Sequence, residues 1–443
     1  MQEPRVFSRY ENDLPLPRGE GKYEMPTIRL GYGHKSINFE YDPARFEVLT
    51  TDSNSTRLND AEIGDALDNP IDSLSLEELV ESGDSVLIVT SDATRATGSA
   101  QVINLLVRRL IQNGVASADI AIIFATGIHR PVRDEEKTQL LTPFIAQRIR
   151  TIDHDAYNAA NLIQIGTTAA GVPIEVNRAL KDFAKIILTS GVGFHYFAGF
   201  TGGRKSICPG LASAPTIEAT HILALDLVRG GRRNGVGTGL LKGNAVSEDC
   251  ERVAALINAT FAINSIVDDA GRVEEVFAGH WQTAHEGACE AYARAHSITV
   301  PEKREIVIVS CGGSPYDINI IQAHKALDMA AHACVDGGTI ILLAECGDGL
   351  GRPDFLKWFD SENSQALESR LRENYEVNGQ TAWALLTKTE TFRVHIVTTR
   401  DDESLRRMRM IPARNIESVL AGLPANATGY IMPRGAAFLP VIN

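Results

Sequence analysis

Short apolar runs alternate with amphipathic stretches along most of the chain, and this alternation predicts an α/β protein. A short apolar run bounded by polar residues is typical of a buried strand. Such runs lie at residues 85–90, 120–125, 185–189, 305–310, 339–344, 392–398 and 429–432. Apolar side chains at helical spacing predict helices after Ser75 and at residues 100–113, 134–149, 281–296 and 317–335. Buried strands separated by helices indicate mainly parallel sheets with helices on both faces.

The alternation stops and then restarts after Pro301, which predicts two domains. A chain of 443 residues is also too long for one compact core. We expect an N-terminal domain at residues 27–290 that carries the chemistry, and a C-terminal α/β domain at residues 291–429. Residues from about 430 to 443 are expected to cross back to the first domain.

The N-terminal end of the chain differs from the rest. Residues 1–26 are polar, contain several prolines and acids, and are expected to form an extended arm. Two alternating segments around Gly31–Lys35 predict a small hairpin. The start has no apolar signal core and no run reaches 18 apolar residues, so we expect a cytoplasmic protein without a membrane span.

Composition narrows the range of partners. The net charge is −13 and the isoelectric point is near 5.4, which argues against a nucleic-acid partner because binding the phosphate backbone needs a basic face. The six cysteines are scattered and no CxxC motif is present, so they are expected to be reduced core residues.

Polar and reactive residues follow several predicted strands. In open parallel sheets, ligands bind beyond the carboxyl ends of the strands. Four loops at such ends are chemically unusual: Ser91–Arg95, Thr126–Arg130, Ser190–His221 and Cys311–Pro315. We expect these loops to share one edge of the fold and to form a site there.

The segment Ser190–His221 is the richest in reactive groups. His195 lies between two aromatic residues and is expected to be partly buried, which favours a neutral imidazole. Glycines before Lys205 leave backbone N–H groups free for an anion, but Arg204 stands where a P-loop needs its second glycine. Lys205 is a phosphate ligand, a Schiff-base amine or a cofactor attachment point, and the residues alone do not decide. His221 is either a metal ligand or a hydrogen-bonded helix residue.

The other candidates also have a structural alternative. His129 follows a strand, and it is a site residue or a surface loop histidine. Asp92 and Arg95 either hold a ligand or form a local ion pair that closes a turn. Gln322 and Lys325 share one helix face, which lines a site or faces solvent. Trp383 serves in packing or in a site.

The sequence resembles the lactate racemase family, whose enzymes use a nickel-pincer nucleotide. The resemblance runs from about residue 27 to the end of the chain. It depends on five motifs, DATR (92–95), GIHR (127–130), GFHYFAGFTGGRKSICPG (193–210), TH (220–221) and QAHK (322–325). The long central motif is highly specific, and the short motifs support it by their order and spacing.

The resemblance implies a role for each candidate residue. Lys205 would carry the pyridinium-3-thioamide-5-thiocarboxylic acid mononucleotide covalently, and His221 would be the protein ligand of its nickel, in a geometry that Ni(II) favours. His129 and His195 would be two catalytic bases on opposite faces of the substrate. Arg95 would bind the substrate carboxylate. The resemblance further implies that Gln322 and Lys325 line the site in the interdomain cleft, and that the nucleotide contacts Asp92, Thr94, Gly202, Gly203 and Trp383.

The reaction implied by the resemblance is inversion of C2 of a 2-hydroxy acid by reversible hydride transfer. One departure concerns the residue before Gln322, which is Ile321 where lactate-specific members carry a tyrosine that positions substrate. Isoleucine cannot form a hydrogen bond, so we expect a 2-hydroxy acid other than lactate to be the better substrate. Proteins that synthesise and insert the cofactor are implied as partners. A homo-oligomer is compatible with the sequence.

Two other functions fit the same residues. A hydrolase would bind zinc through His129, His195 and His221. A non-catalytic carrier of the nucleotide would keep Lys205 but would not need the two histidines as bases. Metal content, the mass of the intact protein and the effect of replacing each histidine distinguish these functions from a racemase.

Overall fold

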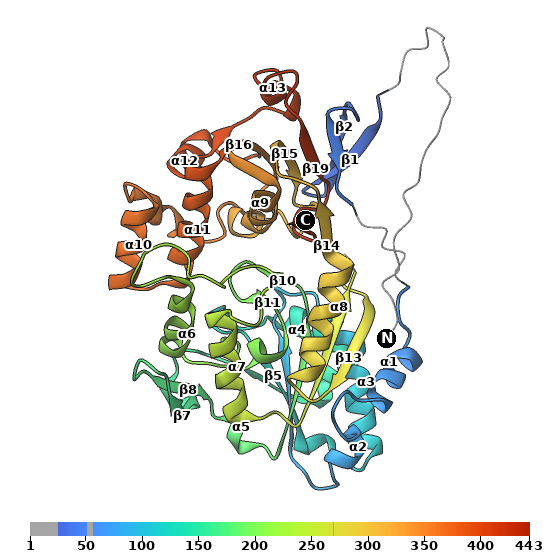
Figure 1. Cartoon of the computed structure of the whole chain (residues 1–443). Coiled ribbons are helices and arrows are strands. Elements are labelled where there is room, and N and C mark those ends of the chain that lie inside the picture. The colour runs from blue at the N-terminus through green and yellow to red at the C-terminus, as the bar shows by residue number, and fades with distance from the viewer. Residues whose placement is uncertain (1–24, 51–55, 269) are drawn as a thin grey trace.

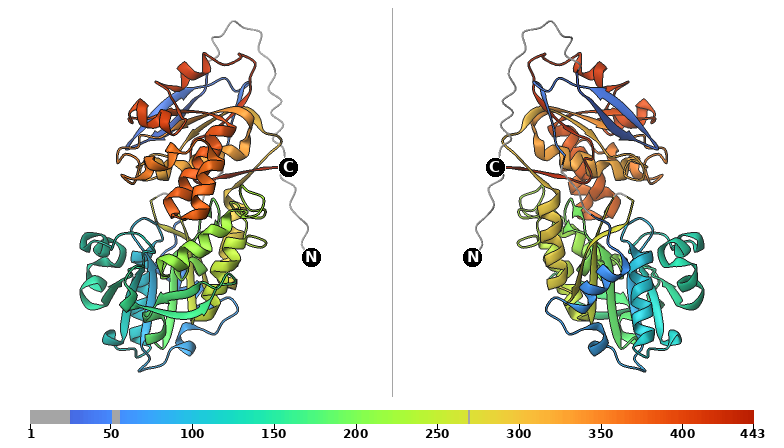
Figure 2. Two further views of the ribbon diagram at one scale, coloured as in Figure 1. Left: turned by 90° about the vertical axis from the view of Figure 1, so that its left-hand side faces the viewer. Right: turned by 90° about the vertical axis from the view of Figure 1, so that its right-hand side faces the viewer.

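The computed structural model describes residues 25–50, 56–268 and 270–443. The arm expected at residues 1–26 therefore lies almost wholly outside the described residues. The chain forms two lobes, each built around a six-stranded sheet with helices packed against it (Figure 1). Side views show the lobes stacked one above the other (Figure 2). The predicted α/β class with two mainly parallel sheets is confirmed.

The first lobe contains a sheet in the order β13-β12-β9-β4-β5-β6. All neighbours are parallel except β12 and β13, which are antiparallel. The strands are β4 (Val86–Ser91), β5 (Ile120–Ala125), β6 (Arg150–Asp153), β9 (Lys185–Gly191), β12 (Phe261–Val267) and β13 (Val273–Gly279). The apolar runs at 85–90, 120–125 and 185–189 thus form the adjacent strands β4, β5 and β9, and their carboxyl ends meet at one edge.

Helices cover both faces of this sheet because β4 is apolar on both sides. Successive side chains of a strand point to opposite faces. Val86 and Ile88 lie in the apolar core with α3 and α4, whereas Leu87 and Val89 lie in a second core with α7. The helices are α1 (Asp60–Asp68), α2 (Leu76–Leu79), α3 (Ser99–Gln112), α4 (Asp134–Arg148), α5 (Ala179–Asp182), α6 (Ala214–His221), α7 (Ala245–Ile257) and α8 (Thr283–His296).

The helix predicted at 134–149 is present as α4, but it is not continuous. Thr142 has φ 66° and ψ 152°, which are not helical values, and Pro143 follows it inside the element. Proline removes a backbone donor and clashes with the preceding turn, so the helix breaks at this point. Additional short strand pairs flank the lobe: β7 (Leu162–Thr167) with β8 (Pro173–Asn177), and β10 (Phe194–His195) with β11 (Gly199–Phe200).

The second lobe contains an all-parallel sheet in the order β18-β17-β16-β15-β19-β3. Its strands are β3 (Phe46–Val48), β15 (Arg304–Ser310), β16 (Cys334–Leu343), β17 (Arg393–Val397), β18 (Ile411–Pro412) and β19 (Gly429–Met432). Its helices are α9 (Ile320–Ala333), α10 (Ser364–Glu373), α11 (Val377–Thr391), α12 (Asp402–Arg407) and α13 (Ile416–Leu420).

The N-terminal strands belong with this second lobe, contrary to the expected start of the first domain at residue 27. The predicted hairpin is present as β1 (Thr27–Tyr32) and β2 (Lys35–Glu40), and the next strand, β3, pairs with β19. Figure 1 shows the blue hairpin beside the upper, orange lobe. A Cβ atom on Gly31 would lie 2.4 Å from the carbonyl carbon of Gly312, so glycine permits this close approach.

Several contacts join the lobes. At the C-terminus, β20 (Leu439–Ile442) pairs with β14 (Ser297–Val300), the strand that follows α8. The Gly231 backbone N–H donates to Glu368 Oε2 at 2.8 Å, and Thr238 Oγ1 donates to Asp328 Oδ2 at 3.1 Å. Asp328 forms a buried ion pair with Lys388, with 2.6 Å between Oδ1 and Nζ. Polar contacts thus connect the loop after α6 to helices α9 and α10, and Asp328 of α9 in turn pairs with α11.

Two further sequence predictions have an outcome in the structure. All six cysteines are buried and unpaired, as expected for core residues. Among the described residues, no helix is long and apolar enough to cross a membrane.

Candidate active site

A pocket of about 220 Å³ lies at the carboxyl ends of β4, β5 and β9, facing the second lobe. Ile321, Val377 and Thr381 close it from the second lobe. Residues singled out from the sequence form much of its wall: Asp92, Arg95, His129, His195, Gly202, Lys205 and His221. The pocket thus gathers three of the four loops that were expected to share one edge.

The fourth loop, Cys311–Pro315, is not in this wall, so the prediction was wrong for it. The backbone N–H of Ser314 donates to the Gly33 carbonyl at 2.8 Å, and a Cβ on Gly313 would lie 2.8 Å from the same oxygen. The glycines of this loop serve close packing against the hairpin. The sequence predicts that a loop after a strand lies at the carboxyl edge of the sheet. It does not predict which other segment packs against that loop.

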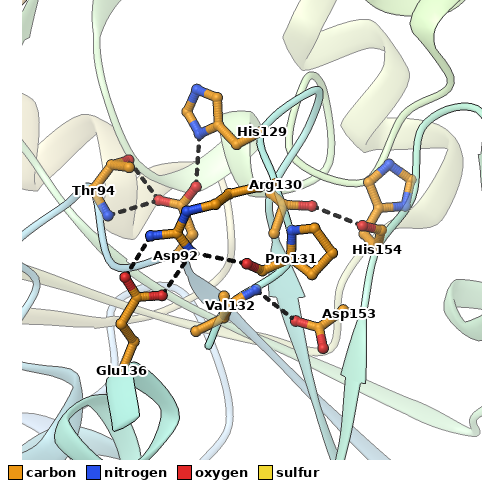
Figure 3. Close-up of polar contacts among 10 residues, drawn as sticks. Asp92, Thr94, His129, Arg130, Pro131, Val132, Glu136, Asp153 and His154 are labelled. Atoms are coloured by element: carbon orange, nitrogen blue, oxygen red, sulfur yellow. Dashed lines mark hydrogen bonds and ion pairs between the residues drawn. The ribbon is translucent and has the colours of Figure 1, made fainter. Parts of the chain in front are cut away.

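At one side of the pocket, the buried carboxylate of Asp92 pairs with the half-exposed imidazole of His129 (Figure 3). The distance between Asp92 Oδ2 and His129 Nδ1 is 2.7 Å, and the other carboxylate oxygen accepts from the backbone N–H and the hydroxyl of Thr94. Burial alone would raise the pKa of Asp92, but these hydrogen bonds and the charges of His129 and Arg95 bring it below its ordinary value. Asp92 is therefore a carboxylate that accepts hydrogen bonds on both oxygens.

His195 is held in a different way. The Ala198 backbone N–H donates to Nδ1 of His195 at 3.2 Å. The ring lies stacked with Tyr196 at 5.4 Å between centroids and edge-on to Phe197 at 4.5 Å. Burial, together with the nearby positive charge of Lys205, holds the pKa of His195 well below its ordinary value. The sequence-based expectation of a partly buried histidine between aromatic residues is confirmed.

Lys205 lies in a short 3-10 helix (Gly203–Ser206) at the bottom of the pocket. It is 8% exposed, and burial together with the charges of Arg95 and Arg204 holds its pKa well below the ordinary lysine value. Such a shift favours the neutral amine, which is the nucleophilic form. Gly203 has φ 50° and a Cβ there would lie 2.3 Å from the His285 ring, so this turn requires glycine.

Arg204 is the buried support of this turn, a role that the sequence did not reveal. Its guanidinium donates to the carbonyls of Ala198 at 2.9 Å and Ser247 at 3.3 Å. Arg204 therefore stands outside the pocket and holds together the segment that carries both His195 and Lys205. The residue that excludes a P-loop in the sequence has a structural role.

His221 is the last residue of α6 and is 5% exposed. Its Nδ1 lies 2.7 Å from the Ile217 carbonyl oxygen, which can only accept, so Nδ1 carries the proton and Nε2 has a free lone pair. Burial, with the charge of Lys205, lowers the pKa of His221 to about 3. A neutral imidazole whose other nitrogen donates to a carbonyl is the state in which histidine binds metals.

The described residues contain no group of three or more His, Cys, Asp or Glu side chains that could hold a metal ion by themselves. His129, His195 and His221 share a pocket but do not form a three-histidine metal site. The donor set therefore does not fit the predicted zinc hydrolase. One histidine with a free Nε2 beside a buried lysine does fit a metal whose other ligands come from an organic group attached to that lysine.

Arg95 lines the pocket, and Lys325 lies near enough for the two charges to interact, although Lys325 is not part of the pocket wall. The Arg95 guanidinium lines the pocket, and among the described residues it makes no hydrogen bond or ion pair. The Lys325 side chain is exposed, and desolvation by the protein around it, with the charge of Arg95, lowers its pKa to about 8. Both groups are thus available to an anion such as a carboxylate.

The residues of the second lobe that line the pocket differ from those that the sequence suggested. Trp383 is 4% exposed and lines a separate hollow together with Ala384 and Lys388, so the pocket geometry gives no support to its predicted contact with a cofactor. The Gln322 side chain is not part of the pocket wall, whereas its neighbour Ile321 is. Thr381 was missed: its Oγ1 lies 3.2 Å from the Tyr196 hydroxyl oxygen, across the two lobes. A threonine in a helix carries no sequence signal for such a contact.

Family models match most of the chain. The model of the lactate racemase N-terminal domain matches residues 32–230, and that of the lactate racemase C-terminal domain matches residues 300–428. The lactate racemase of Thermoanaerobacterium thermosaccharolyticum is 31% identical over 406 residues, which cover 89% of this chain and 94% of that protein. The lactate racemase of Lactiplantibacillus plantarum is 31% identical over 335 residues, which cover 75% of this chain and 77% of that protein.

Solved structures agree with these matches. The lactate racemase apoprotein of T. thermosaccharolyticum superposes with a TM-score of 0.86 at 28% identity and covers 94% of this chain and 100% of that chain. A protein of Thermotoga maritima has a TM-score of 0.67 at 20% identity, with 87% of this chain and 99% of that chain covered, and it shares the fold.

Proposed function

Because the chain belongs to the lactate racemase family, and is therefore an isomerase, we propose that it inverts C2 of a 2-hydroxy acid by reversible hydride transfer to a nickel-pincer nucleotide attached to Lys205. The observation that carries this proposal is the pocket that gathers a buried lysine, a histidine with a free Nε2, two further histidines and an unpaired arginine. When bound, the nucleotide would supply an electrophilic carbon able to accept and return a hydride.

The residues of the pocket fit such a group. The buried amine of Lys205 would be the attachment point, and Nε2 of His221 would be the nickel ligand. In this proposal the nucleotide would lie against the backbone at Gly202 and Gly203, with Asp92 and Thr94 nearby, although the Gly203 N–H itself donates to Ser190 Oγ at 2.9 Å. We infer no contact with Trp383, because it lines a different hollow.

The remaining side chains handle the substrate. Arg95 binds the carboxylate through two parallel hydrogen bonds, and Lys325 adds a second positive charge near it. His129 and His195 exchange the hydroxyl proton on the two sides of C2. Loss of hydride from C2 leaves a planar 2-keto acid, so the hydride can return to either face. The second lobe, through Ile321 and Thr381, limits the access of water.

We expect the protein to act on longer 2-hydroxy acids more efficiently than on lactate. Ile321 and Val377 give the pocket an apolar wall, and burial of one methylene contributes about 0.8 kcal/mol, or about a fourfold gain in kcat/KM. The test is to measure initial rates of inversion by chiral chromatography for a series of substrates from lactate to longer aliphatic and aromatic 2-hydroxy acids. A rate on lactate far above that on every longer acid would contradict the prediction.

A substitution at the same position provides the matched control. Ile321→Tyr introduces a larger side chain with a hydroxyl group, so it is expected to lower kcat/KM for the longer acids more than for lactate. An equal loss on all acids would mean that residue 321 does not set the size preference.

We further propose that the protein works in the cytoplasm and acquires its cofactor from separate proteins for synthesis and insertion. The acidic surface charge and the absence of a membrane-spanning helix among the described residues are compatible with this setting. The alternatives of a zinc hydrolase and of a non-catalytic carrier have no specific support in the pocket.

A further inference from the structure

The Asp92 carboxylate has the setting of a residue that orients a histidine. Its side chain is 7% exposed, and Oδ1 accepts from the Thr94 hydroxyl at 2.6 Å and from the Thr94 backbone N–H at 3.1 Å. These two contacts fix the carboxylate plane and leave Oδ2 directed at His129. Figure 3 shows the imidazole above the carboxylate, with its other nitrogen pointing away from Asp92.

This geometry determines the tautomer of His129. An ionised carboxylate only accepts hydrogen bonds, so the contact of 2.7 Å requires the proton of the neutral ring on Nδ1. Nε2 then carries the lone pair. The His129 side chain is 51% exposed, in the pocket wall, so this lone pair is accessible to a ligand.

The loop that carries His129 is fixed on its other side as well. The His129 backbone N–H donates to the Thr126 carbonyl at 2.9 Å, and the Asp153 carboxylate accepts from the Val132 N–H at 3.1 Å (Figure 3). Arg130 forms an ion pair with Glu136 beyond the histidine. These contacts hold the backbone of the loop, whereas the hydrogen-bond partner of the His129 ring among the described residues is Asp92.

His195 has the opposite arrangement. A backbone N–H is always a donor, so the contact from Ala198 requires a lone pair on Nδ1 of His195 and places the proton of the neutral ring on Nε2. The two histidines thus offer the pocket different groups. One presents a proton acceptor at Nε2, and the other presents an N–H donor.

We propose that Asp92 is a positioning residue that makes His129 the resting proton acceptor of the site, while His195 rests as a hydrogen-bond donor. The role in catalysis rests on the proposed function. As hydride leaves C2, the hydroxyl proton moves to Nε2 of His129, and the resulting imidazolium is stabilised by the Asp92 carboxylate. His195 can accept a proton at Nε2 only after its own proton has moved to Nδ1, which requires the Ala198 N–H contact to open.

The tautomers can be measured without cofactor or substrate. Nitrogen-15 NMR of the full chain labelled at histidine distinguishes a ring nitrogen that carries a proton from one with a lone pair. Signals are assigned by their loss in His129→Gln and His195→Gln. We expect the Nδ1–H form for His129 and the Nε2–H form for His195. The same tautomer in both histidines would overturn the proposal.

The substitution Asp92→Asn tests the cause. The amide oxygen keeps the contacts with Thr94, and the amide NH2 turns toward His129, so Nδ1 must become an acceptor and the proton must move to Nε2. We expect the His129 nitrogen-15 signals to change from those of the Nδ1–H form to those of the Nε2–H form. We also expect kcat to fall about 10²-fold, while KM changes little. An unchanged His129 tautomer in a folded Asp92→Asn protein would overturn the role of Asp92.

Asp153→Asn is the matched control, because its carboxylate supports the same loop without touching the ring. The amide oxygen can still accept from Val132, so the His129 signals are expected to stay as in the wild type. A change in the tautomer here as large as in Asp92→Asn would assign the effect to loop distortion and overturn the proposal. Failure of the proposed racemase function would appear as absent turnover with both NMR results intact, so the two failures are distinguishable.

Discussion

Lys205→Ala is expected to abolish both the covalent attachment of a cofactor and the isomerase activity. Lys205 is the buried amine of the pocket, and its lowered pKa favours the nucleophilic neutral form. An alanine has no group that can form a covalent bond with the nucleotide. Since the cofactor carries the chemistry that no side chain can provide, activity should fall to background even though substrate contacts remain.

The measurement is the mass of the intact protein, purified from a host that makes the nucleotide. The wild type is expected to show a cofactor-sized increment and Lys205→Ala none. Lys181→Ala is the control, because Lys181 is an exposed lysine of the same lobe and lies outside the pocket wall. This variant should keep both the increment and the activity. An increment that survives in Lys205→Ala would place the attachment elsewhere.

His129→Gln and His195→Gln are each expected to lower kcat about 10²- to 10⁴-fold, the usual contribution of one general acid or base. Glutamine preserves much of the size and polarity but cannot exchange a proton. Both variants should keep the mass increment, because neither residue is the attachment point. Loss of activity with the increment retained separates a role in proton transfer from a role in cofactor binding.

Initial rates in both directions provide an internal check. The two enantiomers have equal free energy in water, so any variant must lower kcat/KM by the same factor for both. A histidine variant that reduced only one direction would indicate an assay artefact or a racemic contaminant. Full activity in both variants would contradict the role of His129 and His195 as catalytic bases, and inversion by neither the wild type nor the variants would favour the non-catalytic carrier.

Strands and loops were predictable where local pattern determines them. The apolar runs that form β4, β5 and β9 are buried on both faces, so they appear in the sequence without ambiguity. Because these strands are adjacent and parallel, the loops after them had to meet, and the pocket is at that edge. The physical rule about strand ends therefore located most of the site before any side chain was placed.

Long-range pairing was not predictable from the same pattern. The three residues of β3 are too few to show a period, and their partner β19 lies more than 370 residues away in the sequence. The misplacement of residues 27–48 and the displaced loop at 311–315 have this common cause. Tertiary contacts, here the approach of Gly31 to Gly312, decided both.

The orientation of side chains within the site could not be predicted from the sequence pattern either. Asp92 and His129 are 37 residues apart, and only the closure of β4 against β5 brings the carboxylate to the ring. The sequence offered an ion pair between Asp92 and the nearby Arg95 as one alternative, whereas in the structure Asp92 pairs with His129. The surroundings of Trp383 were not predictable either, because it lines a different hollow from Val377 and Thr381 although all three residues belong to α11.

The central claim is that C2 is inverted by removal and return of hydride. Inversion of a 2-hydroxy acid that carries deuterium at C2, in ordinary water, tests this most directly. If hydride leaves and returns within the closed pocket, the inverted product keeps its deuterium at C2, as measured by mass spectrometry after chiral separation. If the reaction proceeds by proton loss from C2 to a histidine that exchanges with water, the inverted product carries hydrogen instead, and the account is wrong.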